Sequence, residues 1–68
     1  MTYTVVETQT KGETLSTQSW AFTDKKTAFE KFFQTGMYVP NSDVDEHTVM
    51  IFNGGNMAFT PIVKSAIV

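Results

Sequence analysis

Hydrophobic and polar residues alternate along two stretches of the chain, and they follow a helical period in a third stretch between them. Residues 2–22 are rich in Thr, Val, Tyr and Trp with one break at Gly12, which predicts two strands joined by a tight turn. Residues 23–36 carry aromatic side chains at helical spacing. Residues 48–63 again have strand character on both sides of Gly54, so the pattern predicts the order strand, strand, helix, strand, strand.

This order predicts an α+β fold of the ββαββ type, in which two antiparallel hairpins form one sheet and one helix packs on one face of it. The chain has 68 residues, which suits a single domain, residues 1–68, and leaves no room for a second core. The order of the strands within the sheet does not follow from the pattern.

The first hairpin has a register that its turn chemistry determines. A two-residue type II′ turn needs Gly at its first central position, so Gly12 and Glu13 form the turn. Lys11 then lies opposite Thr14, and large apolar residues meet on one face far from the turn. These pairs are Tyr3 opposite Phe22 and Val5 opposite Trp20. Residues 7–19, near the turn, are almost wholly polar and predict a solvated tip beyond the core, with an arm that contacts a partner as the alternative.

The helical segment carries its own start and stop signals. Thr23 is the expected N-cap, because its hydroxyl can accept a hydrogen bond from a free amide of the first turn. Asp24 places negative charge at the positive end of the helix dipole. Gly36 is the expected stop, in a left-handed conformation. The helix is expected to face the sheet through four side chains: Ala28, Phe29, Phe32 and Phe33.

In the second hairpin, a two-residue turn at Gly54 and Gly55 sets Asn53 opposite Asn56. The face assigned to the helix then holds the pairs Phe52–Met57 and Met50–Phe59. The opposite face holds Val49, Ile51, Ala58 and Thr60. Both faces are largely apolar, and one helix covers only one of them, so the second face needs another cover.

The apolar tail after Pro61, residues 62–68, is one candidate for that cover. It folds back over the sheet, extends the last strand, or pairs with the same tail of a second copy. Each large apolar side chain contributes roughly 1.5 to 3 kcal/mol when buried, so we expect a homodimer whose interface uses the second sheet face, the tail or both. The candidate partner-binding residues lie in the acidic loop and in the tail: Asp43, Asp45, Glu46, Ile62, Val63, Ile67 and Val68.

The composition excludes several classes of protein. The chain contains no Cys and one His, which rules out disulfides and Cys-ligated zinc. It has no Arg and a net charge of −2, which argues against nucleic acid as a partner because a phosphate backbone requires a cationic patch. The sequence starts without a basic-then-apolar leader and has no apolar run of membrane-spanning length, so we expect a cytoplasmic protein with no membrane contact.

Candidate chemistry is sparse. Residues 43–47 offer carboxylate and imidazole ligands in close succession, but the glycine and the closing acidic residue of a calcium loop are missing. No known motif arranges a Ser or Cys nucleophile with His47. We therefore expect no metal, no cofactor and no catalytic site.

The leading hypothesis is a small non-enzymatic protein-interaction module that acts as a homodimer and binds an unidentified protein partner, of the accessory or inhibitory kind that bacteria and phages make. Two alternatives stay open. One is a nucleic-acid-binding domain that uses Lys25, Lys26 and Lys31 on the helix. The other is a small-molecule binder or enzyme with its site at a subunit interface near His47 and Tyr38.

Overall fold

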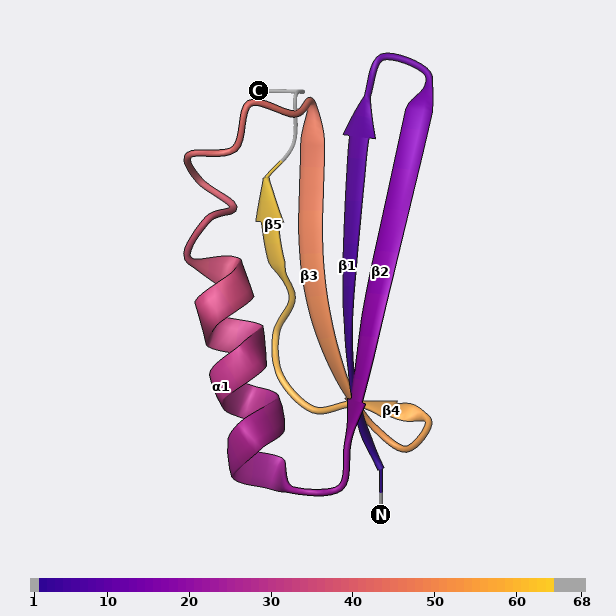
Figure 1. Ribbon diagram of the computed structural model, residues 1–68, viewed down its shortest axis with the longest axis vertical. Helices are drawn as coiled ribbons and strands as arrows, with labels where there is room; N and C mark the ends of the chain where they lie inside the picture. The colour runs from indigo at the N-terminus through magenta and orange to yellow at the C-terminus, as the bar shows by residue number, and fades with distance from the viewer. Residues whose placement is uncertain (1, 65–68) are drawn as a thin grey trace.

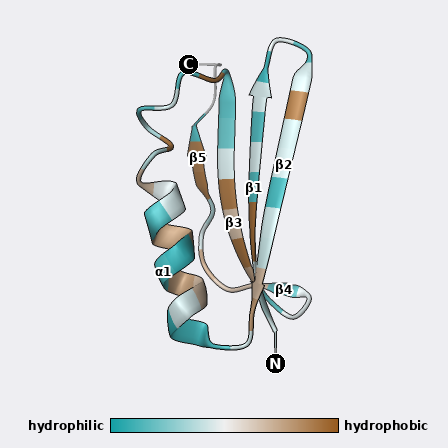
Figure 2. Cartoon of the chain, in the orientation of Figure 1, coloured by the Kyte–Doolittle hydropathy of each residue, from teal (hydrophilic) through white to brown (hydrophobic). Residues whose placement is uncertain are grey.

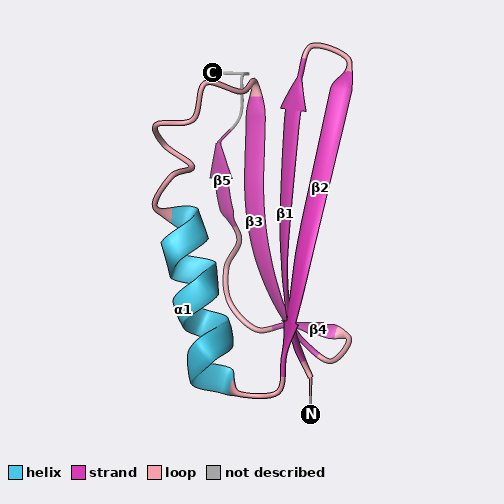
Figure 3. Ribbon diagram, viewed as in Figure 1, coloured by secondary structure: helices cyan, strands magenta, loops and turns pink. Residues whose placement is uncertain are grey.

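The computed structural model describes residues 2–64, which form one five-stranded sheet and one helix. The elements are β1 (Tyr3–Lys11), β2 (Thr14–Phe22), α1 (Lys25–Gly36), β3 (Glu46–Asn53), β4 (Asn56–Met57) and β5 (Ile62–Lys64). The helix packs along one side of the antiparallel sheet (Figure 1, Figure 3). The predicted α+β class, with antiparallel hairpins on either side of one helix, is confirmed.

β1 occupies the middle of the sheet, between β2 and β3. It pairs antiparallel with both neighbours, so β2 and β3 run parallel to each other with one strand between them. Parallel strands cannot be joined by a short turn, and α1 supplies the crossover that connects these two. β4 and β5 pair with two successive parts of β3 and share its second edge.

The predicted register of the first hairpin is confirmed along its whole length, from Tyr3 opposite Phe22 to Lys11 opposite Thr14. Gly12 has a φ of 61°, and no described non-glycine residue has a positive φ. Gly12 therefore supplies the left-handed conformation at the first central position, as the type II′ turn requires.

The hairpin tip is only partly solvated. β2 is exposed from Thr14 to Ser19, as predicted, and β1 becomes hydrophilic toward the turn (Figure 2). The prediction is wrong for Glu7, which is buried. The tip itself is bound by the loop that precedes β3, since the amide of Asp45 donates to the carbonyl of Thr10 over 2.8 Å.

Both ends of the helix differ from the sequence prediction. The N-cap is Asp24 rather than Thr23: its carboxylate accepts hydrogen bonds from the amide of Thr27 at 2.9 Å and from the Thr27 hydroxyl at 2.6 Å. Gly36 is the last helical residue and not a left-handed stop, because its φ is not positive. Met37 caps the end of the helix, and its amide donates a hydrogen bond of 3.0 Å to the carbonyl of Phe33.

The second hairpin presents the opposite face to the helix from the one predicted. Val5 pairs directly with Ile51, and residues that lie opposite each other in a sheet point to the same side. Val49 and Ile51 are therefore buried beneath the helix, while Met50 and Phe52 point to the outer face. The predicted assignment failed because β3 is apolar on both faces, so that only its pairing with β1 decides which face is covered.

The second hairpin is also shorter than predicted. Asn53 pairs with Asn56 and Phe52 with Met57 as expected, but the predicted pair of Met50 with Phe59 is not formed. The chain leaves the sheet after β4 and returns only at β5. Phe59 instead packs against the aromatic rings of the helix, with ring centroids 6.2 Å from Phe29, 5.9 Å from Phe32 and 5.5 Å from Phe33.

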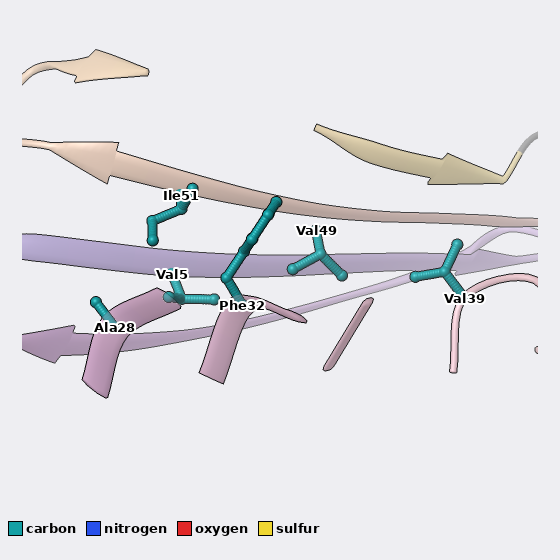
Figure 4. Close-up of a cluster of buried hydrophobic side chains, with 6 residues drawn as sticks. All are labelled: Val5, Ala28, Phe32, Val39, Val49 and Ile51. Carbon is teal, nitrogen blue, oxygen red and sulfur yellow. The ribbon is translucent and has the colours of Figure 1, made fainter. Parts of the chain in front are cut away.

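The core lies between α1 and the sheet and extends into the loop after the helix (Figure 4). Its buried hydrophobic side chains are Val5, Ala28, Phe32, Val39, Val49 and Ile51. Of the four helix residues predicted to face the sheet, Ala28 and Phe32 are fully buried, whereas Phe29 is half-buried and Phe33 is 46% exposed. Phe33 lies at the rim of the aromatic cluster, where Phe59 covers part of it.

Candidate functional site

A cleft of about 240 Å³ opens between α1 and the hairpin of β1 and β2. It is lined by Glu7, Gln18, Trp20, Lys31, Gln34, Thr35 and Tyr38. On the helix-facing side of the hairpin, the pair of Val5 and Trp20 is followed by the pair of Glu7 and Gln18. Beyond Trp20, toward the turn, the hairpin therefore presents polar side chains on its helix-facing side.

Glu7 is the only acidic side chain that lines the cleft, and it pairs with His47 of β3. The Nε2 atom of His47 lies 2.6 Å from Oε2 of Glu7, and the two side chains are only 5% and 11% exposed, respectively. Glu7 lies opposite Val49 in the sheet, two residues from His47, so the pair forms a diagonal contact on the helix-facing side.

The pairing uses one ring nitrogen of His47. A carboxylate accepts hydrogen bonds, so Nε2 of His47 carries a hydrogen and donates the bond to Oε2 of Glu7. The other ring nitrogen of His47, Nδ1, is buried and has no hydrogen-bond partner within residues 2–64.

No lysine neutralises that carboxylate in the described part of the chain. The lysine of the cleft, Lys31, instead places its ammonium 4.3 Å from the centroid of the Trp20 ring. Such a cation–π contact contributes about 0.5 to 1 kcal/mol at an exposed site. The cleft therefore contains a buried carboxyl group and a separate, half-buried ammonium that lies over an aromatic ring.

The acidic loop residues predicted to bind a partner do not line the cleft, and two of them contact the hairpin tip. The carboxylate of Asp45 accepts a hydrogen bond from the amide of Gly12 at 2.7 Å. Asp43 forms a solvent-exposed ion pair with Lys11 at 3.7 Å. Glu46 begins β3 and is exposed. Asp45 therefore binds the hairpin tip of its own chain, whereas the carboxylates of Asp43 and Glu46 are exposed to solvent.

The tail residues predicted to bind a partner divide between the two faces of the sheet. Ile62 packs against the core beside Val49, whereas Val63 is 60% exposed on the outer face. Ile67 and Val68 lie outside the described residues. Residues 62–64 of the tail form a separate strand, β5, which pairs antiparallel with β3 and does not continue β4.

Two of the three lysines considered for nucleic-acid binding contact aromatic rings of their own chain, and Lys26 is exposed. Lys25 lies 6.0 Å from the ring centroid of Phe29, and Lys31 is bound to Trp20. Trp20 and Tyr3 are partly buried against the core, and the accessible face of the Trp20 ring is in contact with Lys31.

The sequence contained one signal for the cleft that the prediction missed. Glu7 follows Val5 by two residues, so the predicted register already placed a carboxylate on the apolar side of β1. His47 and Tyr38 were expected near a shared site, and the structure brings Tyr38 and the His47 partner Glu7 to one cleft. Both residues lie within one chain.

Residues 2–64 contain no group of three or more His, Asp or Glu side chains arranged to hold a metal ion. Within the same residues, the helix is too short and too polar to cross a membrane. No protein family, curated protein or solved structure matches this chain.

Proposed function

We propose that this protein is a small, non-enzymatic protein-interaction module that acts as a homodimer. The observation that carries the proposal is the outer face of the sheet, the side that α1 does not cover. Seven apolar side chains point to this face: Val6, Leu15, Ala21, Met50, Phe52, Met57 and Val63. Leu15, Met57 and Val63 are 68%, 51% and 60% exposed, and none of the seven is buried.

The chemistry of this face favours a second copy of the chain as its occupant. A two-fold interface brings the same surface patch of both copies together, so a charged patch would face its own sign. Among the outward-pointing strand residues that the structure describes, only Glu46 is charged, and it lies at one end of β3. The remaining outward positions of β1 and β2 are small or uncharged, mostly Thr and Ser. A neutral, partly apolar face can therefore meet its own copy without repulsion.

The small core makes association favourable. Six hydrophobic side chains are fully buried within the described residues, a modest number for a chain with no disulfide. A dimer would remove further apolar surface from water at roughly 25 cal/mol per Å². The same absence of disulfides suits a reducing compartment, and the cytoplasm is the location included in this proposal.

Analytical ultracentrifugation over a range of protein concentrations tests the dimer. The chain has a mass of 7.6 kDa, and we expect the measured mass to rise to twice this value with concentration. Met50→Lys should restore the single-chain mass, because two-fold symmetry would bring two buried ammonium groups into the interface. Asn41→Lys adds the same charge in an exposed loop and serves as the matched control, which should remain dimeric.

A single-chain mass at every concentration would exclude the homodimer. A dimer that Met50→Lys leaves intact would exclude the outer face as its interface. Circular dichroism of both variants verifies the fold, and Met50 is half-buried, so lysine should be tolerated at this position in the monomer.

A further inference from the structure

The cleft between α1 and the first hairpin has the electrostatics of a cation site. Glu7 presents a buried carboxylate whose Oε2 atom lies 2.6 Å from Nε2 of His47. Its second oxygen has no hydrogen-bond partner within residues 2–64. The last turn of α1, which contributes Gln34 and Thr35 to the cleft, contains no basic side chain to offset the negative end of the helix dipole. A positively charged group would be stabilised by both features.

The face of Trp20 already holds a cation in the free protein. The ammonium of Lys31 lies 4.3 Å from the ring centroid, so this aromatic face is accessible to a charged group. Lys31 forms no ion pair in the described part of the chain, and its long flexible stem lets the ammonium move into solvent. An incoming cation can therefore replace Lys31 on the ring.

We propose that this cleft binds a guanidinium group, with the Glu7 carboxylate as its anchor and the Trp20 ring as its stacking surface. A guanidinium is planar, stacks on aromatic rings and is more weakly hydrated than an ammonium. It also offers five N–H donors, and the cleft provides further acceptors in the side chains of Gln18, Gln34 and Tyr38. An ammonium of the kind carried by Lys31 cannot use these features together.

The size of the cleft limits the ligand to a small group. Its volume of about 240 Å³ lies below the roughly 300–1,000 Å³ typical of sites that enclose a drug-sized molecule. An arginine side chain on the surface of another protein has a suitable size, and so does a free guanidino compound. The two share the same chemistry and are separated by the experiment.

NMR titration of the full-length protein tests the proposal, with the indole N–H signal of Trp20 as the reporter. The first probe is N-acetyl-L-argininamide, an arginine whose ends are blocked and uncharged. We expect saturable shifts at Trp20 and Tyr38. The citrulline analogue has nearly the same shape but an uncharged urea, and it should produce no saturable shift. Methylguanidine, a free guanidino compound with the same single positive charge as the blocked arginine, forms the second arm: tighter binding than the blocked arginine assigns a free small molecule, and equal or weaker binding assigns a protein side chain.

Variants test the two contacts separately. Glu7→Gln keeps an oxygen that can accept the hydrogen bond from His47, so the fold should persist. The substitution removes the carboxylate and should weaken binding of the guanidinium about tenfold or more. Glu30→Gln makes the same change on an exposed part of the helix and should bind like the wild type. Lys31→Met removes the competing cation while keeping the stem, so binding should be at least as tight as in the wild type.

Several outcomes would overturn the guanidinium site. These are the absence of saturable shifts, equal shifts from the citrulline analogue, or unchanged binding by Glu7→Gln. Weaker binding by Lys31→Met would contradict the replacement of Lys31 on the Trp20 ring by the guanidinium. The cleft and the outer face lie on opposite sides of the sheet, so Met50→Lys should leave arginine binding unchanged whatever its effect on the dimer.

Discussion

Gly36, the last residue of α1, lies against Ile62 of β5 so closely that a Cβ at position 36 would overlap the Cδ1 atom of Ile62. The contact joins the end of the helix to the strand that returns to the edge of β3. Glycine therefore lets the Cδ1 methyl of Ile62 pack directly against the end of the helix, and a larger residue would displace that methyl. The φ of Gly36 is not positive, so no left-handed conformation is involved.

Gly36→Ala should destabilise the protein by about 1 to 3 kcal/mol, the usual cost of overpacking a core. The sign of this change in stability is informative, because alanine in place of a helical glycine would otherwise stabilise the protein by up to about 1 kcal/mol. Urea unfolding followed by Trp20 fluorescence measures the change.

The matched background for that variant is Ile62→Val, which removes Cδ1 and should by itself cost about 0.5 to 1.5 kcal/mol. In this background Gly36→Ala should become neutral or stabilising, since the overlapping atom is absent. An equal loss of stability in both backgrounds would contradict the close contact.

The helix cap gives a second prediction, which separates two adjacent residues. Asp24→Ala should lower the melting temperature, because it removes the acceptor for the amide and the hydroxyl of Thr27. Thr23→Ala should have little effect, since Thr23 forms no hydrogen bond within the described residues. Asp24→Asn should retain most of the stability, because an amide oxygen also caps a helix. A larger loss from Thr23→Ala than from Asp24→Ala would restore the N-cap that the sequence predicted.

The contribution of Asp24 should depend on pH. The hydrogen bond from the Thr27 hydroxyl, and then that from the Thr27 amide, hold the pKa of Asp24 below its ordinary value of 3.8. A carboxyl whose pKa is lower in the folded state contributes stability above its unfolded pKa and loses it as the pH falls through its folded pKa. The difference in melting temperature between wild type and Asp24→Ala should therefore shrink below pH 3.8. A difference that stays constant down to pH 2 would contradict this account.

The pair of Glu7 and His47 should behave as a unit. Glu7→Met leaves the buried Nε2–H of His47 without an acceptor and should cost about 1 to 3 kcal/mol. His47→Leu leaves a buried carboxylate without its donor and should cost at least as much. The double variant should lose clearly less than the sum of the two, because neither polar group then remains unpaired. Additive losses in urea unfolding would show that the two side chains do not depend on each other.

Two neighbouring aspartates should differ in their effect on the hairpin tip. Asp45→Ala removes a 2.7 Å hydrogen bond to the amide of Gly12 and should cost about 0.5 to 1.5 kcal/mol. Asp43→Ala removes only an exposed ion pair and should cost about 0 to 1 kcal/mol. Amide hydrogen exchange reports the difference directly, since Gly12 should exchange faster in Asp45→Ala alone. Equal acceleration in both variants would assign the effect to loop charge rather than to the hydrogen bond.

The residues that the sequence predicted correctly are those whose structure depends on near neighbours. The register of β1 and β2 follows from Gly12, because the turn sets which residues of the adjoining strands face each other. The buried positions Ala28 and Phe32 follow from the helical period. The turn pair of Asn53 and Asn56 follows from the two glycines between them.

The cleft was only partly predictable, because its parts come from distant segments. Tyr38 and His47 were suspected as members of one site, and Glu7 was read as part of a solvated tip. Its buried partner His47 lies forty positions further along the chain and reaches it only through the pairing of β1 with β3. The contact of Lys31 with Trp20 likewise depends on where α1 crosses the hairpin.

Turn chemistry and hydrophobic period in the sequence by itself determined β1, β2, α1 and β3, their order, and the register of the first hairpin. Only the tertiary structure decided which side of β3 is buried, because Val49, Met50, Ile51 and Phe52 are all apolar and local preference does not distinguish the two sides. The pairing of Val5 with Ile51 decides it. That choice covers Val49 and Ile51 with the helix, and it leaves Met50 and Phe52 on the face assigned to a second copy of the chain.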